Sequence, residues 1–196
     1  MSRSRRHRPL AILFVVTILP VLAGGLLYLN PGLLPRTRVH HGELFDPVRS
    51  LAAMRLTRIG KGPFGPEELR GKWNLVWVTA APCEIACRKR LDRMLQIHLA
   101  LGKDLLRLQR LVIFLDRTRA PQFAAAINAY RDTIALAPAD GRSGAFLAAT
   151  FEVQNRSAGL FIVDPQSNII LRYENGADPE GVLKDLKRLL KYSWIG

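Results

Sequence analysis

The sequence predicts an α/β domain carried behind one N-terminal transmembrane helix. Apolar runs at residues 73–79 and 111–115 are typical of buried strands, and apolar residues at helical spacing follow each run. Residues 9–29 contain no charged side chain, and about 20 apolar residues are enough to span a bilayer. The only two cysteines, Cys83 and Cys87, follow the first strand. Their place between a strand and a helix indicates a site that uses sulfur chemistry.

The N-terminal segment predicts the location of the domain. Four arginines lie within residues 1–8, and the positive-inside rule keeps such a tail in the cytoplasm and sends the remainder across the membrane. We therefore expect a basic cytoplasmic tail at 1–8 and a transmembrane helix at 9–29. A cleavable signal peptide ending near Val21-Leu22-Ala23 is the alternative. The anchor is favoured because Leu26-Leu27-Tyr28-Leu29 extends the apolar run past that site.

Composition is consistent with one basic domain outside the cytoplasm. The chain has 196 residues and a formal net charge of +13, and about 150 residues are enough for a single core. On an exported domain this charge favours anionic lipid or an acidic protein face as a partner and excludes nucleic acid. The alternative is that the basic clusters merely line solvated helix faces. These clusters are Arg88, Lys89, Arg90 and Arg93, and Lys184, Lys187, Arg188 and Lys191.

The elements of the domain follow in order. Residues 30–62 contain three prolines and no sustained periodicity, so we expect a connector that partly wraps the domain, which then occupies 63–196. Beyond the strand at 73–79 and the cysteines, apolar residues from 91 to 108 predict a long helix with a possible break at Gly102. The remaining elements are a strand at 111–115, a helix at 121–130, a weaker helix at 141–151, a hairpin at 159–163 and 169–173, and a helix at 178–192.

Two thiols at this spacing permit three uses. Soft thiolates select Cu(I), so a two-coordinate copper site is reasonable. Alternatively Cys83 is the attacking thiolate and Cys87 the resolving partner of a reversible disulfide, which requires Cys83 to sit at or before the helix N-cap because helical positions four apart hold their Cβ atoms too far apart. A permanent structural disulfide is the third use, although a loop of three intervening residues gains little stabilisation.

The order strand, dithiol, helix, strand, helix, hairpin, helix is that of the thioredoxin-like fold. Leu69-Arg70-Gly71-Lys72-Trp73, the cysteine pair and Phe161-Ile162-Val163-Asp164-Pro165 resemble the Sco/SenC copper chaperones of cytochrome c oxidase assembly. With Val39-His40-His41-Gly42-Glu43-Leu44 and the anchor, the whole layout is most similar to the small proteobacterial membrane proteins associated with that oxidase. The resemblance implies a single-pass inner-membrane protein with a periplasmic domain, Cu(I) as a metal, and an oxidase subunit or another copper-assembly protein as partner.

One departure from that family concerns the third copper ligand. The resemblance places a histidine shortly before the hairpin, where this chain has Gln154-Asn155-Arg156-Ser157-Ala158-Gly159. Arg156 stands nearest the missing ligand, and guanidinium stays protonated and cannot ligate a metal. His98 lies eleven residues beyond Cys87, too far along a continuous helix to ligate with it. His40 and His41 remain candidates if the connector folds over the dithiol.

We therefore expect a membrane-anchored, periplasmic thioredoxin-like accessory protein of cytochrome c oxidase assembly. Cys83 and Cys87 would bind Cu(I) transiently or keep a copper-site dithiol reduced. A catalytic thiol-disulfide oxidoreductase with broader substrates and a non-catalytic scaffold with a structural disulfide are the alternatives. No motif indicates a small-molecule substrate.

Overall fold

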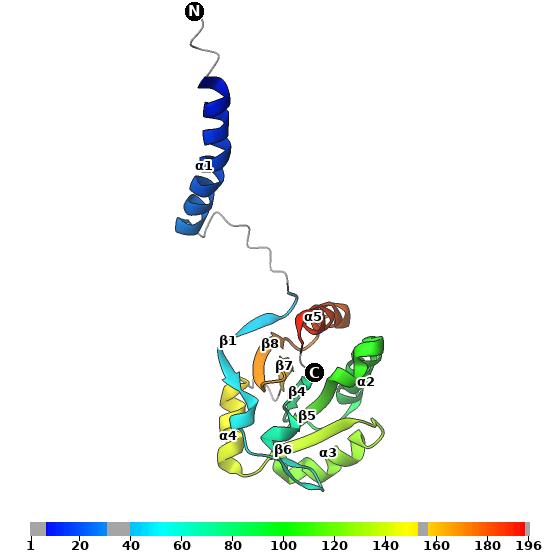
Figure 1. Cartoon of the computed structure of the whole chain (residues 1–196). Coiled ribbons are helices and arrows are strands. Elements are labelled where there is room, and N and C mark those ends of the chain that lie inside the picture. The colour runs from blue at the N-terminus through cyan, green and yellow to red at the C-terminus, as the bar shows by residue number, and fades with distance from the viewer. Residues whose placement is uncertain (1–6, 31–39, 153–156, 195–196) are drawn as a thin grey trace, which may run out of the picture. The chain divides into compact units, whose positions relative to one another are not determined.

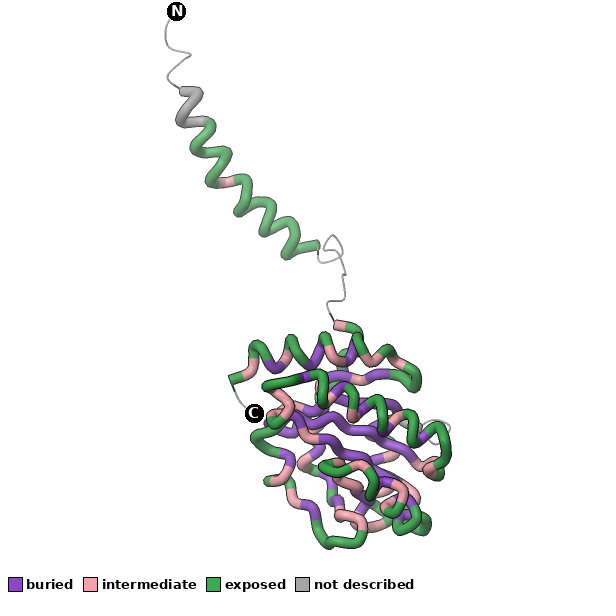
Figure 2. The backbone as a smooth tube through the Cα atoms, turned by 90° about the vertical axis from the view of Figure 1, so that its right-hand side faces the viewer, coloured by how far each residue is buried: buried purple, intermediate pink, exposed green. Residues whose placement is uncertain are grey.

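A computed structural model of the chain describes residues 7–30, 40–152 and 157–194. The chain divides into two compact units, Met1–Val39 and His40–Gly196. The first contains one helix, α1 (His7–Leu29). Its segment Ile12–Leu29 is long and apolar enough to cross a membrane and is nowhere buried, as Figure 2 shows. The apolar segment of the sequence is thus one continuous helix and a candidate for a membrane span.

The second unit is built on one eight-stranded sheet with the order β1-β8-β7-β4-β5-β6-β2-β3 (Figure 1). Strands β4, β5 and β6 are parallel, and the remaining neighbours pair antiparallel. The strands are β1 (Glu43–Ser50), β2 (Leu56–Arg58), β3 (Gly62–Phe64), β4 (Trp73–Thr79), β5 (Leu108–Phe114), β6 (Thr133–Pro138), β7 (Ser157–Val163) and β8 (Asn168–Tyr173). The three parallel strands β4, β5 and β6 all end on the same side of the sheet. We call this side the C-terminal edge of the sheet.

Helices cover both faces of this sheet. Apolar side chains of α2 (Ile85–Leu99), α3 (Ala120–Ile127) and α5 (Pro179–Tyr192) pack on one face. The other face is covered by α4 (Gly141–Thr150) together with residues 45–69. Short 3₁₀ turns lie at η2 (Leu51–Ala53), η3 (Pro66–Glu68), η4 (Gly102–Arg107) and η5 (Arg117–Arg119).

The central strand β4 is buried along its whole length, as its nearly continuous apolar sequence predicts. Its alternate residues enter different cores, with Trp77 on the α2 face and Val76 and Val78 on the α4 face. This two-sided burial holds the end of β4, and therefore the start of the cysteine loop, in a fixed position.

Most of the expected elements are present within a few residues of their predicted bounds. The predicted break in the long helix falls at Gly102, where η4 begins after the end of α2. The predicted hairpin is formed by β7 and β8. Between these strands Asp164 accepts hydrogen bonds from the backbone N–H groups of Gln166 and Asn168, so it is the turn former that its position suggests.

The expected connector at 30–62 needs correction, because its second half is part of the sheet. From His40 the chain belongs to the compact unit, and β1 pairs with β8 along an edge of the sheet. Phe45, Leu51 and Met54 are buried in the core of the α4 face. Of the expected 30–62 segment, residues 31–39 lie outside the described part of the chain.

Candidate functional site

The two cysteines are joined in a disulfide at the C-terminal edge of the sheet. Their Cα atoms lie 4.9 Å apart, within the usual range for a disulfide. Cys83 belongs to the loop after β4, and Cys87 lies in the first turn of α2. The structure therefore brings together the two residues that the sequence singles out.

The loop before α2 explains how two cysteines four residues apart can bond. Glu84 is the N-cap residue of α2 and has an extended backbone, so Cys83 lies before the helix begins. The chain leaves β4 through a turn in which the N–H of Ala81 donates to the hydroxyl oxygen of Thr79. Because Cys83 is outside the helix, its side chain is free of the helical spacing that would keep the two Cβ atoms apart.

The two sulfur-bearing residues differ in exposure. Cys87 is only 5% exposed and packs in the core with Trp77 and Leu91, whereas Cys83 is half-buried at the margin of this core. Glu84, Ile85 and Ala86 between them are exposed, and Ile85 is 74% exposed. Cys83 is therefore the more accessible end of the disulfide.

Positive charge surrounds this end of α2. Arg88 and Lys89 are exposed, and the guanidinium of Arg90 lies 5.7 Å from the centre of the Trp77 ring. Burial, and secondarily the neighbouring Arg93, lower the pKa of Arg90 from its ordinary value. The start of a helix also stabilises negative charge through its free backbone N–H groups. These groups favour a thiolate, and Glu84 opposes it.

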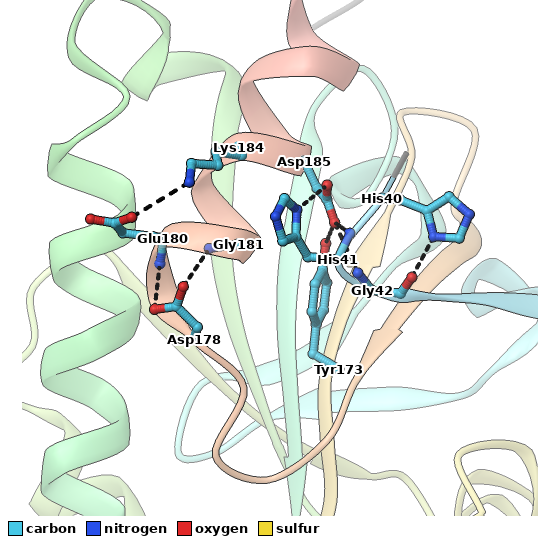
Figure 3. A network of polar contacts seen from close by, with 9 residues as sticks. All are labelled: His40, His41, Gly42, Tyr173, Asp178, Glu180, Gly181, Lys184 and Asp185. Carbon is cyan, nitrogen blue, oxygen red and sulfur yellow. Dashed lines mark hydrogen bonds and ion pairs between the residues drawn. The ribbon is translucent and has the colours of Figure 1, made fainter. Parts of the chain in front are cut away.

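The histidines expected as candidate copper ligands have other partners. Figure 3 shows His40 and His41 just before β1, with their side chains pointing to opposite sides of the chain. The Nδ1 atom of His40 is hydrogen-bonded to the carbonyl oxygen of Gly42, and Nδ1 of His41 lies 3.2 Å from Oδ1 of Asp185 on α5. The segment containing them is thus held by α5, and the idea that it folds over the dithiol is not supported.

Asp185 is a buried carboxylate that sequence reasoning missed. It is 3% exposed, and its Oδ2 atom accepts hydrogen bonds from the backbone N–H groups of His41 (2.8 Å) and Gly42 (2.9 Å) and from the hydroxyl of Tyr173 (2.8 Å) (Figure 3). Burial acts to raise its pKa, but these hydrogen bonds outweigh burial and lower the pKa from its ordinary value. Burial and the contact with Asp185 raise the pKa of Tyr173.

A signal for Asp185 exists in the sequence. Val182, Asp185 and Leu186 have the spacing of one helix face, so an aspartate stands in the apolar stripe of α5. Such a carboxylate must find hydrogen-bond donors when it is buried. The sequence does not show which donors these are, because His41 lies 144 residues away.

The remaining histidine of the domain, His98, lies at the opposite end of α2 from Cys87. His98 is half-buried in the last turn of α2, where burial and the charge of Arg110 lower its pKa. Arg156 lies outside the described residues. Within residues 7–30, 40–152 and 157–194, no group of three or more His, Cys, Asp or Glu side chains is placed to hold a metal ion.

With this geometry established, a family model described as transmembrane-like, thioredoxin-like, C-terminal domain matches residues 73–193. The chain belongs to this family. The match begins with β4 and ends after α5, so it contains both cysteines and Asp185. No curated protein matches the chain.

Several solved structures similar to this chain are of Sco proteins. Yeast Sco1 with copper bound has a TM-score of 0.62 at 16% identity and covers 78% of this chain and 93% of its own. Arabidopsis thaliana ScoI with copper bound has a TM-score of 0.60 at 14% identity, covering 78% and 99%. Bradyrhizobium japonicum ScoI with copper bound has a TM-score of 0.55 at 17% identity, covering 75% and 98%. At these identities the comparison establishes a thioredoxin-like fold, which confirms the predicted fold class and the structural resemblance to Sco/SenC-like proteins.

Proposed function

We propose that this chain is a membrane-anchored accessory protein of cytochrome c oxidase assembly that exchanges its disulfide with the dithiol of a copper site. The observation that carries the proposal is the Cys83–Cys87 disulfide, with one accessible and one buried end at an open edge of the sheet. The likeness to copper-bound Sco structures supports the pathway, and one similar structure is of a disulfide switch in BsSco, a Sco-family cytochrome c oxidase assembly protein.

The proposed reaction moves two electrons from this chain to its partner. In the reduced chain, the thiolate of Cys83 attacks one sulfur of the partner's disulfide, forming a mixed disulfide and releasing the partner's other sulfur as a thiolate. The thiolate of Cys87 then attacks the sulfur of Cys83, which closes the Cys83–Cys87 disulfide and frees the second partner thiolate. The partner leaves as a dithiol able to bind copper. A dithiol reductase of the same compartment must reduce this chain again.

Transient binding of Cu(I) as cargo is the second candidate function. The two cysteine sulfur atoms favour it. After reduction the chain offers two soft thiolates, one in the loop after β4 and one in the first turn of α2, and such a pair suits Cu(I). No third His, Cys, Asp or Glu joins them within the described ranges. Cys83 and Cys87 alone would then hold the ion, which suits brief carriage better than tight storage.

The proposed location is the inner membrane, with the domain in the periplasm. The apolar segment Ile12–Leu29 supports an anchor. The arginines of residues 1–8 support a cytoplasmic N-terminus, and a dithiol that forms a disulfide suits an oxidising compartment.

Two titrations of the full chain in a non-ionic detergent test the proposal. The first measures the reduction potential of the disulfide in thiol redox buffers. We expect a value above about −300 mV, as for exchangeable disulfides, and a lower potential would indicate a structural bridge instead. The second is an anaerobic titration of the reduced chain with Cu(I) against a competing chelator. Stoichiometric binding that is lost in a Cys83→Ser, Cys87→Ser variant would support Cu(I) carriage, and equal weak binding by both would exclude it.

A further inference from the structure

The surface around the disulfide combines exposed apolar side chains with uncompensated positive charge. Pro82, Ile85 and Ala86 are all exposed in the loop and first turn that contain the cysteines. Ile85 is the first residue of α2 and is 74% exposed. A β-branched residue at this position adds little to helix stability, and an exposed one contributes no burial. Among the residues that the structure describes, no packing partner covers this isoleucine between the cysteines.

The charges near the disulfide do not cancel. Within one turn beyond Cys87 lie Arg88, Lys89 and Arg90, and the one carboxylate between the cysteines is Glu84. A turn of helix rises about 5.4 Å, less than the screening length of about 10 Å in 0.1 M salt. All three cations therefore attract a negatively charged group that approaches Cys83.

Neighbouring carboxylates offset this set only in part. Four cations, Arg88, Lys89, Arg90 and Arg93, stand against three carboxylates. These are Glu84, Asp92, which accepts a hydrogen bond from the hydroxyl of Tyr130, and Glu174, which lines a small pocket with Arg90 and Arg93. On the adjacent loop after β5, Asp116 pairs with Arg119, their nitrogen and oxygen atoms being 3.7 Å apart, while Arg117 has a favourable electrostatic interaction with Asp140. The described charges at this end of α2 therefore remain positive overall.

We propose that this surface docks an acidic protein segment in which an apolar residue lies next to the reacting cysteine. The apolar side chain would cover Ile85, and the flanking carboxylates would face Arg88, Lys89 and Arg90. Docking in this way would bring the partner's sulfur to Cys83, the accessible end of the disulfide. The inference rests on the proposed exchange reaction and adds the chemical class of its partner.

The test uses two synthetic thiol peptides of equal length on the oxidised full chain in a non-ionic detergent. Both contain two cysteines, so that the second thiol can release the mixed disulfide and close a disulfide within the peptide. Leucine lies beside the first cysteine, which is flanked by aspartates in one peptide and by lysines in the other. Rates of reduction are expressed per thiolate, using the measured thiol pKa of each peptide. We expect the acidic peptide to react about tenfold faster at low salt, at the lower end of electrostatic steering, and this preference to fade in about 1 M salt.

Two charge-reversal variants separate local from overall charge. Arg88→Glu, Lys89→Glu should abolish the preference. Lys61→Glu, Arg131→Glu changes the net charge equally but lies at the opposite edge of the sheet, near the turn after β2 and the start of β6, and should retain it. An Ile85→Ser variant should slow the acidic peptide several-fold at every salt concentration.

Equal rates per thiolate for the two peptides, or equal effects of the two charge-reversal variants, would overturn the docking surface while leaving the exchange reaction standing. A disulfide that neither peptide reduces, although dithiothreitol does, would overturn the exchange reaction together with the docking surface.

Discussion

Asp185 shows at the scale of one residue how the start of the domain is held in place. Its carboxylate joins the segment before β1 to α5 and β8 through His41, Gly42 and Tyr173. A buried acceptor with three donors on a single oxygen is costly to alter, since each donor would be left without a partner.

Replacing Asp185 with asparagine is expected to lower the free energy of unfolding by about 2–4 kcal/mol, because a neutral amide oxygen would accept the three hydrogen bonds more weakly than the ionised carboxylate does. Chemical denaturation measures the change. Glu180→Gln is the control, since Glu180 forms an exposed pair with Lys184 on the same helix and should lose less than about 0.5 kcal/mol. Equal losses in both variants would show that the network adds no stability.

The Asp185 network also predicts a pH dependence of stability. The folded state lowers the pKa of Asp185, so its contribution is fully present above the ordinary aspartate pKa of about 3.9. The contribution is lost as the pH falls through the lower pKa of the folded state. The stability difference between the wild type and Asp185→Asn should therefore shrink when denaturation is repeated in increasingly acidic buffer. A difference that grows on acidification would contradict the lowered pKa.

At the scale of one element, β7 depends on a glycine where it passes β8. Gly159 has φ +96°, and a Cβ atom there would run into the backbone carbonyl oxygen of Tyr173. Gly159→Ala should therefore cost about 2 kcal/mol or more. Gly144→Ala in α4 is the matched control, because its Cβ would make only ordinary contact with Pro138, and alanine should stabilise the helix by about 0.5–1 kcal/mol. The midpoint of thermal unfolding should fall in Gly159→Ala and rise in Gly144→Ala. A shift in the same direction in both variants would contradict this account.

The elements also show how far the sequence predicts the fold. Strands β4, β5, β7 and β8 and helix α2 are long or strongly apolar, so local pattern predicts them. Strand β1 contains Pro47 and several exposed residues, and β2 and β3 have three residues each. Such short or partly exposed strands owe their form to the neighbours they pair with rather than to local pattern. Strand β6 was not expected, although Leu136 is fully buried.

The candidate site divides in the same way. Cys83 and Cys87 are close in sequence, so their spacing predicts a local site. Other contacts depend on how distant elements pack. Examples are the contact between His41 and Asp185 and the contact of Arg90 with Trp77. No periodicity predicts such contacts, so the sequence leaves His40 and His41 as candidate copper ligands only if the connector folds over the dithiol.

At the scale of the whole molecule, the domain begins at His40 rather than at residue 63. A fragment starting at His40 should fold with the cooperativity of the full-length domain. A fragment starting at Leu51 lacks β1 and Phe45 and leaves Asp185 without the donors of His41 and Gly42. It should lose about 4 kcal/mol or more. Circular dichroism during thermal unfolding compares the two fragments, and equal stability would place the domain boundary after β1.

The central claim is that Cys83 exchanges disulfides and Cys87 resolves them, and trapping the mixed disulfide in cells tests it most directly. With Cys87→Ser, the intermediate cannot be resolved, so Cys83 should accumulate in a covalent complex with an oxidase subunit or another copper-assembly protein. Cys83→Ser should give little or no such complex, because Cys87 is buried. The claim is contradicted if neither variant traps a partner and the double variant still supports full oxidase activity.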